Sequence, residues 1–480
     1  MGAMTLRRQV LSGLRWTAAA KFVSQLFTWS ITIVVIRLLT PADYGLLAMA
    51  MLFVGLLMLL TEFGIGAAVV QAEAMDVQKL RQMFALAILV DFGLFLLLFL
   101  AAPLIAAFFL EPRLIWIVRV LAVQFIVSIF GVIPGSQLTR KLDFKSQSLL
   151  DLSSSIVGSL TTLGFAMAGF GVWALVWGSL VITVWRTVGI NLICPFVHWP
   201  DFSVKGTRAL LFFGGNFTVT RIVWFFYSQA DVLIAGKIFG KELLGIYSVA
   251  MHLAGLPVQK ISSVINQVSF PAFARVQDDR EKFASHFLLA TRALSFVAFP
   301  VLWGISCTAP ELVRVLLGTN WEAAALPMQL LALIMPVYMM TPFMVTAAQG
   351  IGRADIALKQ VLPASIVMPI AFLIGSQWGV VGLSLAWVVA FPFVFVGSLI
   401  TFLPIINLRM MDVFSAMARP VLAALGMYFV VTLAREAIAP GTHIVIQTSV
   451  LVIAGAITYS ALAVAINRQG CREIIDLLKG

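Results

Sequence analysis

The chain has 480 residues, of which 61% are hydrophobic and only 11% are charged, and its mean hydropathy is +1.03. Soluble domains usually contain about 45–50% apolar and about 25% charged residues, so this composition excludes an ordinary globular enzyme, a disordered chain and a nucleic-acid-binding domain. It is typical of an all-α polytopic membrane protein, whose helices satisfy their own backbone hydrogen bonds in lipid. The net charge of +11 then indicates cytoplasmic loops rich in Lys and Arg.

Apolar stretches long enough to cross a bilayer follow one another along the whole chain. The first contains Lys21 and lacks the uninterrupted core of a cleaved signal peptide, so we expect a permanent span. With about 20 apolar residues per helix, the sequence predicts fourteen spans: 14–38, 44–70, 82–108, 114–133, 149–168, 172–194, 209–235, 243–270, 286–307, 326–348, 358–377, 380–405, 413–434 and 443–466. The connections are too short for a folded soluble domain, and no phosphate-binding GxxxxGK[ST] motif occurs.

The distribution of Lys and Arg predicts the orientation. If the N-terminus is cytoplasmic, the inside segments carry 19 basic residues and the outside segments carry 6. Basic residues concentrate on the cytoplasmic side of membrane proteins. We therefore expect both termini in the cytoplasm and an even number of spans.

A weak internal repeat predicts the domain organisation. Residues 12–56 align without gaps to residues 212–256, with identities that include Gly45 with Gly245, and with Lys21 facing Arg221. A shift of six spans preserves orientation, which predicts two lobes related by an axis along the membrane normal, a transporter plan with the substrate site between the lobes. The predicted parts are a six-helix lobe at 1–205, a second at 206–408, and two additional helices with a cytoplasmic tail at 409–480.

Basic side chains inside the spans are the candidate substrate-binding residues. A Lys or Arg at the centre of a membrane helix costs about 2.5–3.5 kcal/mol and usually faces a wet cavity or a partner charge. Lys21 and Gln25 lie on one polar stripe, Arg221 occupies the matching depth in the second repeat, and Lys260 lies on a similar stripe of the next span. An ion pair that only holds helices together is the alternative for each basic residue. For Arg119, Arg186 and Arg292 we expect such a structural or interfacial role.

The charge of these residues selects the class of ligand. Opposite unit charges 4 Å apart gain about 4 kcal/mol at an effective dielectric constant of 20, so a basic vestibule favours an anionic, phosphate-bearing headgroup over a cationic drug. The intramembrane acids Glu62, Asp91 and Asp231 are candidates for binding a coupling proton or Na⁺, with structural pairing as the alternative. Asp151 is a further acid within the spans.

Several kinds of chemistry have no support in the sequence. The three cysteines and four histidines show no metal-ligand spacing, so we expect no metal site and no cofactor. No catalytic residues can be assigned, because the sequence has no nucleophile motif and no acidic cluster in a large outside loop. Tryptophans such as Trp177 and Trp185 fit an interfacial belt, although a few could stack on sugars.

Three stretches resemble bacterial polysaccharide-transport flippases of the MOP superfamily, closest to the colanic-acid and exopolysaccharide exporters. They are RLLTPADYGLLAMAMLFVGLLMLLTEFGIGAAVVQ at 37–71, QADVLIAGKIFGKELLGIYSVAMHLAGLPVQKISSVINQVSFPAFARVQDD at 229–279 and GTNWEAAALPMQLLAL at 318–333. The resemblance implies a fold like that of multidrug and toxin extruders and lipid II flippases. It also implies that the protein is a transporter and not an enzyme.

The implied activity is alternating-access translocation of an undecaprenyl-diphosphate-linked oligosaccharide across the inner membrane. Membrane lipid, a polysaccharide polymerase and a chain-length regulator are the implied partners, and the resemblance carries the idea of basic cavity residues onto Lys21, Arg221 and Lys260. Two alternative functions remain. An ion-coupled drug exporter of the same superfamily would depend on the acids more than the bases, and a membrane polymerase or ligase would need essential residues in an outside loop.

Overall fold

The computed structural model describes residues 25, 27–61, 76–141, 143–203, 208–276, 279–353, 355–439, 441–466 and 470, without the side chains of 208–221, 263–272 and 274. Within these ranges the regular structure is entirely helical. Eleven stretches are long and apolar enough to cross a membrane. Of these, Asp355–Ile406 contains two of the predicted spans, and Ile222–Ser262 covers parts of two others. The predicted all-α polytopic membrane fold is therefore confirmed.

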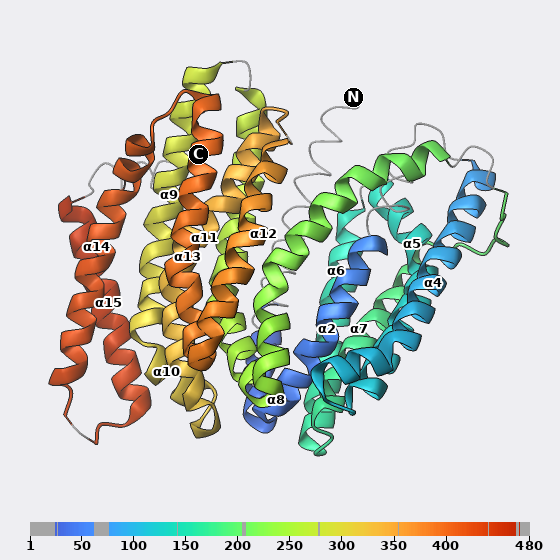
Figure 1. The fold of residues 1–480 in the computed structure, drawn as a ribbon, viewed down its shortest axis with the longest axis horizontal. Coiled ribbons are helices and arrows are strands. Elements are labelled where there is room, and N and C mark those ends of the chain that lie inside the picture. The colour runs from blue at the N-terminus through green and yellow to red at the C-terminus, as the bar shows by residue number, and fades with distance from the viewer. Residues whose placement is uncertain are drawn as a thin grey trace. The chain divides into compact units, whose positions relative to one another are not determined.

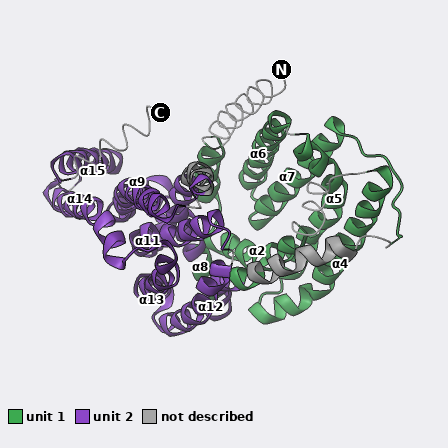
Figure 2. Ribbon diagram, turned by 90° about the horizontal axis from the view of Figure 1, so that it is seen from above, with its two compact units in different colours: residues 1–225, 239–245 green, residues 226–238, 246–480 purple. Residues whose placement is uncertain are grey.

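The chain forms two compact units, and the first comprises residues 1–225 together with 239–245 (Figure 2). Its described helices begin with the short apolar Phe27–Leu38. They continue with α2 (Pro41–Thr61), α4 (Val77–Phe109), α5 (Leu114–Arg140), α6 (Phe144–Met167), α7 (Val172–Ile193) and the start of α8 (Arg208–Arg275), labelled in Figure 1. Of the first predicted span, 14–38, only residues 25 and 27–38 lie within the described part of the chain.

The second unit comprises residues 226–238 and 246–480. It contains most of α8 and the helices α9 (Arg280–Cys307), α10 (Ala309–Leu316), α11 (Ala325–Gly350), α12 (Asp355–Gly375), α13 (Gly379–Phe402), α14 (Met410–Ala437) and α15 (Ile444–Ile466). Three short 3₁₀ turns, η2 (Thr319–Ala324), η3 (Ser376–Trp378) and η4 (Leu403–Ile406), connect them. The predicted division at residues 205 and 408 stays a prediction.

One glycine separates the two spans that α8 contains. The sequence predicts spans at 209–235 and 243–270, and the chain leaves helical geometry between them at Gly240, where φ is 75° and ψ is −172°. This left-handed φ is accessible to glycine because it lacks a Cβ atom. Gly240 therefore reverses the chain at the end of the seventh predicted span.

Aspartates cap three helix starts that follow predicted cytoplasmic loops. Asp76, Asp143 and Asp279 each accept a hydrogen bond from the backbone N–H three residues later, at the starts of α4, α6 and α9. Such caps satisfy N–H groups that have no partner within the helix. At Asp279, hydrogen bonds from the Lys282 side chain and its backbone N–H hold the pKa of the carboxyl below its usual value.

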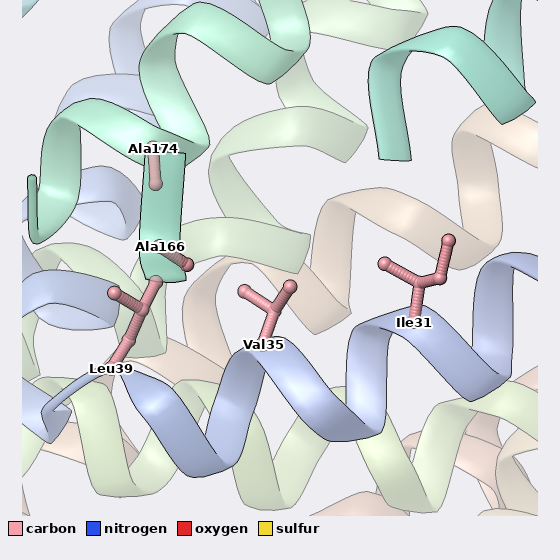
Figure 3. Packing of buried hydrophobic residues seen from close by; sticks show 5 residues of the cluster. All are labelled: Ile31, Val35, Leu39, Ala166 and Ala174. Carbon is pink, nitrogen blue, oxygen red and sulfur yellow. The ribbon is translucent and has the colours of Figure 1, made fainter. Parts of the chain in front are cut away.

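The first described helix packs on the α6–α7 hairpin of unit 1. Ile31, Val35 and Leu39 lie along one side of this helix and form one buried cluster with Ala166 and Ala174 (Figure 3). Their spacing of four residues places the three larger side chains on one stripe. The alanines leave room for this stripe, so it anchors the helix against the ends of α6 and α7.

Small residues bring α6 and α7 into close contact. A Cβ added to Gly178 would overlap the Thr162 hydroxyl, and a Cβ added to Gly158 would overlap the Ile182 side chain. Small residues at membrane helix interfaces let backbones approach and pack through van der Waals contacts. This close contact sets the register of α6 against α7, and the register determines which of their side chains lie opposite each other.

The glycines paired by the internal repeat meet each other in unit 1. A Cβ on Gly45 would overlap the Lys241 carbonyl, and a Cβ on Gly245 would overlap the Pro41 carbonyl and lie 3.0 Å from the Gly45 nitrogen. Lys241 also forms an ion pair with Glu111 at 2.7 Å. The start of α2 and residues 241–245 therefore cross at backbone contact distance, which only glycine permits.

We expect Gly45→Ala and Gly245→Ala each to destabilise the protein by about 1–3 kcal/mol, because backbone atoms cannot yield as a flexible side chain can. Thermal unfolding of the purified protein measures the effect. Gly93→Ala in α4 is the matched control, since no atom lies within 4 Å of a Cβ at that position. Equal melting temperatures for all three variants would contradict this close crossing.

Candidate functional site

The structure describes only part of the predicted substrate site. Lys21 and Glu62 lie outside the described residues, and for Arg221 only the backbone, within α8, is described. Gln25 is half-buried at the start of the described chain, and Lys260 lies exposed on α8. The role of these side chains in substrate binding stays a prediction.

Asp231 is fully engaged by neutral hydrogen-bond donors in unit 2. The Tyr247 hydroxyl donates to its Oδ2 at 2.6 Å, the Trp387 Nε1–H donates to the same oxygen at 3.3 Å, and the Val232 N–H donates to Oδ1 at 2.8 Å. These hydrogen bonds lie in the interior of unit 2, where Asp231 is only 1% exposed. Trp387 belongs to α13 and is packed edge-on against Tyr338 of α11. The carboxyl group thus ties α8 to α13.

Asp91 of α4 has a different environment. It is 0% exposed, and neither carboxylate oxygen has a hydrogen-bond partner among the described residues. A buried charge without a partner is expensive, since desolvation is not repaid. A proton or a bound cation would remove that cost, which makes Asp91 the stronger of the two described acids as an ion-binding candidate.

A second polar group without a partner lies at the same level as Asp91. The antiparallel pair α4 and α5 makes ring contacts at Phe84 with Phe130 and a cation–π contact at Phe99 with Arg119. These contacts place Asp91 at about the level of Gln124, which is 5% exposed and whose Nε2 also lacks a partner in the described part of the chain. The described part of the α4–α5 pair therefore contains two buried polar groups without partners at a similar level.

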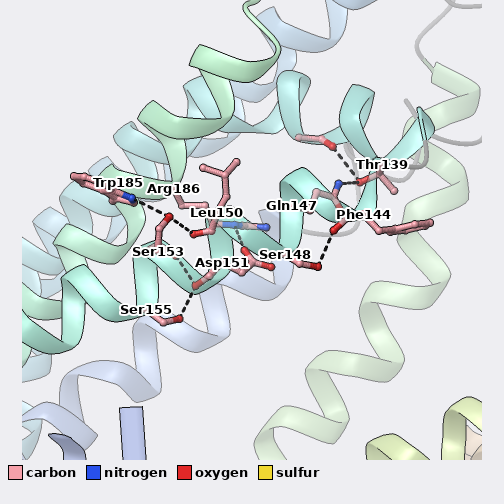
Figure 4. Close-up of polar contacts among 12 residues, drawn as sticks. Thr139, Phe144, Gln147, Ser148, Leu150, Asp151, Ser153, Ser155, Trp185 and Arg186 are labelled. Atoms are coloured by element: carbon pink, nitrogen blue, oxygen red, sulfur yellow. Dashed lines mark hydrogen bonds and ion pairs between the residues drawn. The ribbon is translucent and has the colours of Figure 1, made fainter. Parts of the chain in front are cut away.

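An exposed ion pair joins α6 and α7 of unit 1. Arg186 Nε and Asp151 Oδ1 lie 3.0 Å apart, and their side chains are 59% and 57% exposed. The adjacent Trp185 donates from Nε1 to Ser153 Oγ at 3.1 Å. Figure 4 shows Trp185 and Arg186 directed from α7 toward Ser153 and Asp151 of α6.

Further hydrogen bonds order the α6 side of this cluster. The Ser155 hydroxyl donates to the Asp151 carbonyl at 2.7 Å, and Gln147 Nε2 donates to the Thr139 hydroxyl of α5 at 2.8 Å (Figure 4). The sequence indicated only a structural or interfacial role for Arg186 and did not connect it with Asp151. The serine run 153–155 and the similar depth of both charges in consecutive spans were the available signal.

The acids of the connection between α9 and α11 are held in ion pairs. Glu311 pairs with Arg435 of α14 at 2.7 Å, and Glu322 pairs with Arg314 at 2.9 Å. Within the described ranges, no three His, Cys, Asp or Glu side chains gather in a way that could hold a metal ion. The connection thus has a structural role that links α10 to α14.

Comparison with known proteins identifies the family. The family described as "Polysaccharide biosynthesis protein" matches residues 34–326, more than half of the chain. A teichuronic acid biosynthesis protein, TuaB of Bacillus subtilis, is 27% identical over 96% of both chains. The succinoglycan biosynthesis transport protein ExoT of Rhizobium meliloti is 24% identical over 92% of this chain and 90% of its own.

Solved structures identify the fold. The lipid II flippase MurJ superposes with a TM-score of 0.79 at 15% identity, covering 94% of this chain and 99% of MurJ. An inward-facing MATE multidrug transporter of the MOP superfamily gives 0.62 at 14% identity, covering 82% of this chain and 96% of its own. The resemblance seen in the sequence is thereby confirmed. The chain is a multi-pass membrane protein that belongs to the polysaccharide biosynthesis protein family and has the fold of the MOP superfamily.

Proposed function

We propose that this protein is a flippase that moves an undecaprenyl-diphosphate-linked oligosaccharide across the inner membrane by alternating access, as a transporter and not an enzyme. The observation that carries the proposal is the family match, supported by relatives named for polysaccharide biosynthesis and transport along nearly the whole chain. The MurJ-like fold supports it, because lipid II is itself a lipid-linked saccharide.

The diphosphate is the part of the substrate that the basic residues recognise in this proposal. Lys21, Arg221 and Lys260 supply positive charge in a hydrated vestibule, and Gln25 adds a neutral hydrogen-bond donor. Each charge within 4 Å of a phosphate oxygen contributes about 4 kcal/mol at an effective dielectric constant of 20. The polyprenyl tail stays in the lipid while the headgroup crosses.

Coupling to a proton or Na⁺ gradient would give the transport its direction. Asp91 is the acid best suited to this role, because its buried carboxyl group has no hydrogen-bond partner in the described part of the chain. Asp231 already receives three hydrogen bonds, so ion binding there would compete with Tyr247 and Trp387. Glu62 remains a third candidate from the sequence.

An ion-coupled multidrug exporter is the second candidate function, and the MATE-like fold is the observation that favours it. It predicts that loss of the protein increases sensitivity to cationic drugs without affecting surface polysaccharide. A polymerase or ligase is less well supported, since both acids in the connection between α9 and α11 are held in ion pairs. A polymerase and a chain-length regulator are instead the proposed protein partners, and both termini are proposed to be cytoplasmic.

Deletion of the gene, followed by leaflet-resolved analysis of lipid-linked oligosaccharides, tests the proposal. We expect the lipid-linked units to accumulate in the cytoplasmic leaflet and surface polysaccharide to disappear, with recovery of both on expression of the wild-type chain. Accumulation in the periplasmic leaflet would contradict the flippase and favour a polymerase or ligase. Unchanged polysaccharide with new drug sensitivity would favour the exporter.

A further inference from the structure

The Asp151–Arg186 pair lies deep within the membrane-spanning helices. Asp151 is seven residues after the start of α6 at Phe144, and Arg186 is seven residues before the end of α7 at Ile193. At 1.5 Å per residue both lie about 10 Å from the helix ends, within a hydrocarbon layer about 30 Å thick. Charges at this depth are costly in lipid and usually face water or protein.

The two faces of α6 indicate whether the ion pair faces lipid or water. Leu149, Leu160 and Met167 recur at intervals of eleven and seven residues, and they form an apolar exposed face suited to lipid. Asp151 and Ser155 lie on the opposite face, which faces α7 and packs against it farther along through Gly158 and Thr162, whereas Asp151 and Arg186 remain more than half exposed. A half-exposed charge pair on the face turned away from the lipid-suited side indicates a hydrated surface.

Stability alone does not explain this ion pair. Exposed ion pairs contribute little to stability, whereas inserting each charge into the membrane is costly. The close contact between α6 and α7 is already provided by Gly158, Thr162 and Gly178. The pair is therefore available for binding a ligand at the hydrated face.

We propose that Asp151, Arg186 and Trp185 form a subsite for a sugar ring of the transported oligosaccharide, which rests on the proposed flippase function. In their mutual contact Asp151 uses one carboxylate oxygen and Arg186 uses Nε, which leaves an acceptor oxygen and further N–H donors for adjacent ring hydroxyls. Trp185 is 46% exposed, and its hydrogen bond to Ser153 fixes the indole orientation. Its flat apolar ring face suits the C–H face of a sugar.

The charge balance of the cluster selects sugar over phosphate. The Arg186 guanidinium is neutralised by Asp151 at 3.0 Å, so the pair has no net charge with which to attract a diphosphate. Paired charges still form stronger hydrogen bonds to hydroxyl groups than neutral groups do. The subsite thus takes an uncharged polyhydroxyl ring, while the diphosphate belongs to the basic residues of the proposed vestibule.

Cysteine labelling tests the hydration of this face independently of transport. We expect Ser155→Cys to react with a membrane-impermeant thiol reagent, because it lies one turn from Asp151 on the polar face. Leu160→Cys, on the apolar face, is the matched control and should react only with a membrane-permeant reagent. Labelling is compared with the parent protein, and an unreactive Ser155→Cys variant would overturn the proposal.

Binding of the free oligosaccharide repeat unit, which carries no diphosphate, tests the ligand class on the purified protein. We expect Asp151→Asn, Arg186→Gln and Trp185→Ala each to weaken binding at least tenfold and to lower transport while membrane levels stay normal. Trp177→Ala is the control, since this tryptophan lies eight residues earlier on the same helix and is 41% exposed. Unchanged sugar binding in all three variants would overturn the proposal.

A charge exchange separates ligand binding from helix packing. The D151R/R186D variant can restore an ion pair but reverses the positions of donors and acceptors, so we expect sugar binding and transport to remain impaired. Full restoration would assign a structural role to the pair and overturn the proposal. The subsite can fail in this way while the gene deletion still shows accumulation in the cytoplasmic leaflet, so the two proposals are tested separately.

Discussion

The K21Q/R221Q double variant is expected to lose polymer export while its level in the membrane stays normal. Each Gln keeps a hydrogen-bonding side chain but removes a charge that contributes about 4 kcal/mol to a phosphate 4 Å away, and tenfold in binding corresponds to about 1.4 kcal/mol. The loss should exceed a hundredfold. Surface polysaccharide of a deletion strain that expresses the variant measures it.

The control for this variant is Arg119→Gln. Arg119 is also an intramembrane arginine, but its guanidinium lies 4.7 Å from the Phe99 ring centroid and 5.4 Å from that of Trp116. We expect this variant to retain export, because the rings and not the substrate surround the charge. Wild-type export by K21Q/R221Q would remove the proposed diphosphate site.

Asp91→Asn is expected to abolish the dependence of transport on an ion gradient and to leave the fold intact. The amide is nearly the same shape as the carboxyl group but cannot bind a proton or balance a cation, and it removes the cost of a buried charge. Transport in vesicles with an imposed proton or Na⁺ gradient measures the coupling. A gradient response equal to that of the wild type would exclude Asp91 as the coupling residue.

Asp231→Asn is expected to lower the melting temperature, unlike Asp91→Asn. Its amide places donors near the Tyr247 hydroxyl and Trp387 Nε1–H, which now donate to Asp231. Hydrogen bonds to charged groups contribute about 1.5–3 kcal/mol, so this variant should melt at a lower temperature than the wild type. Asp91→Asn should melt at an equal or higher temperature, which distinguishes an ion-binding acid from a structural one.

Hydropathy was sufficient to predict the helices, because twenty apolar residues in lipid have few alternatives to a helix. The predicted 172–194 corresponds to α7 at Val172–Ile193, and the predicted 443–466 corresponds to α15 at Ile444–Ile466. The repeat also singled out Gly45 and Gly245, which the structure brings into backbone contact. The paired glycines of the repeat thus indicated where two backbone segments cross in close contact.

The partners of buried polar groups could not be predicted in the same way. Trp387 lies 156 residues from Asp231, and Arg186 lies 35 residues from Asp151. These pairings depend on the rotation and register of neighbouring helices, which hydropathy does not specify. A polar stripe on one span indicates that this helix face does not face lipid. It does not indicate which residue of another helix pairs with the polar side chains.

Transport of a lipid-linked oligosaccharide by the purified protein in liposomes tests the central claim most directly. Undecaprenyl-diphosphate oligosaccharide is incorporated on one side, and a membrane-impermeant glycosidase added to the other side reports the headgroups that have crossed. The account predicts rapid exposure with the wild-type protein and none above protein-free liposomes with K21Q/R221Q. Equal exposure with both proteins, or none with the wild type under an imposed proton or Na⁺ gradient, would contradict it.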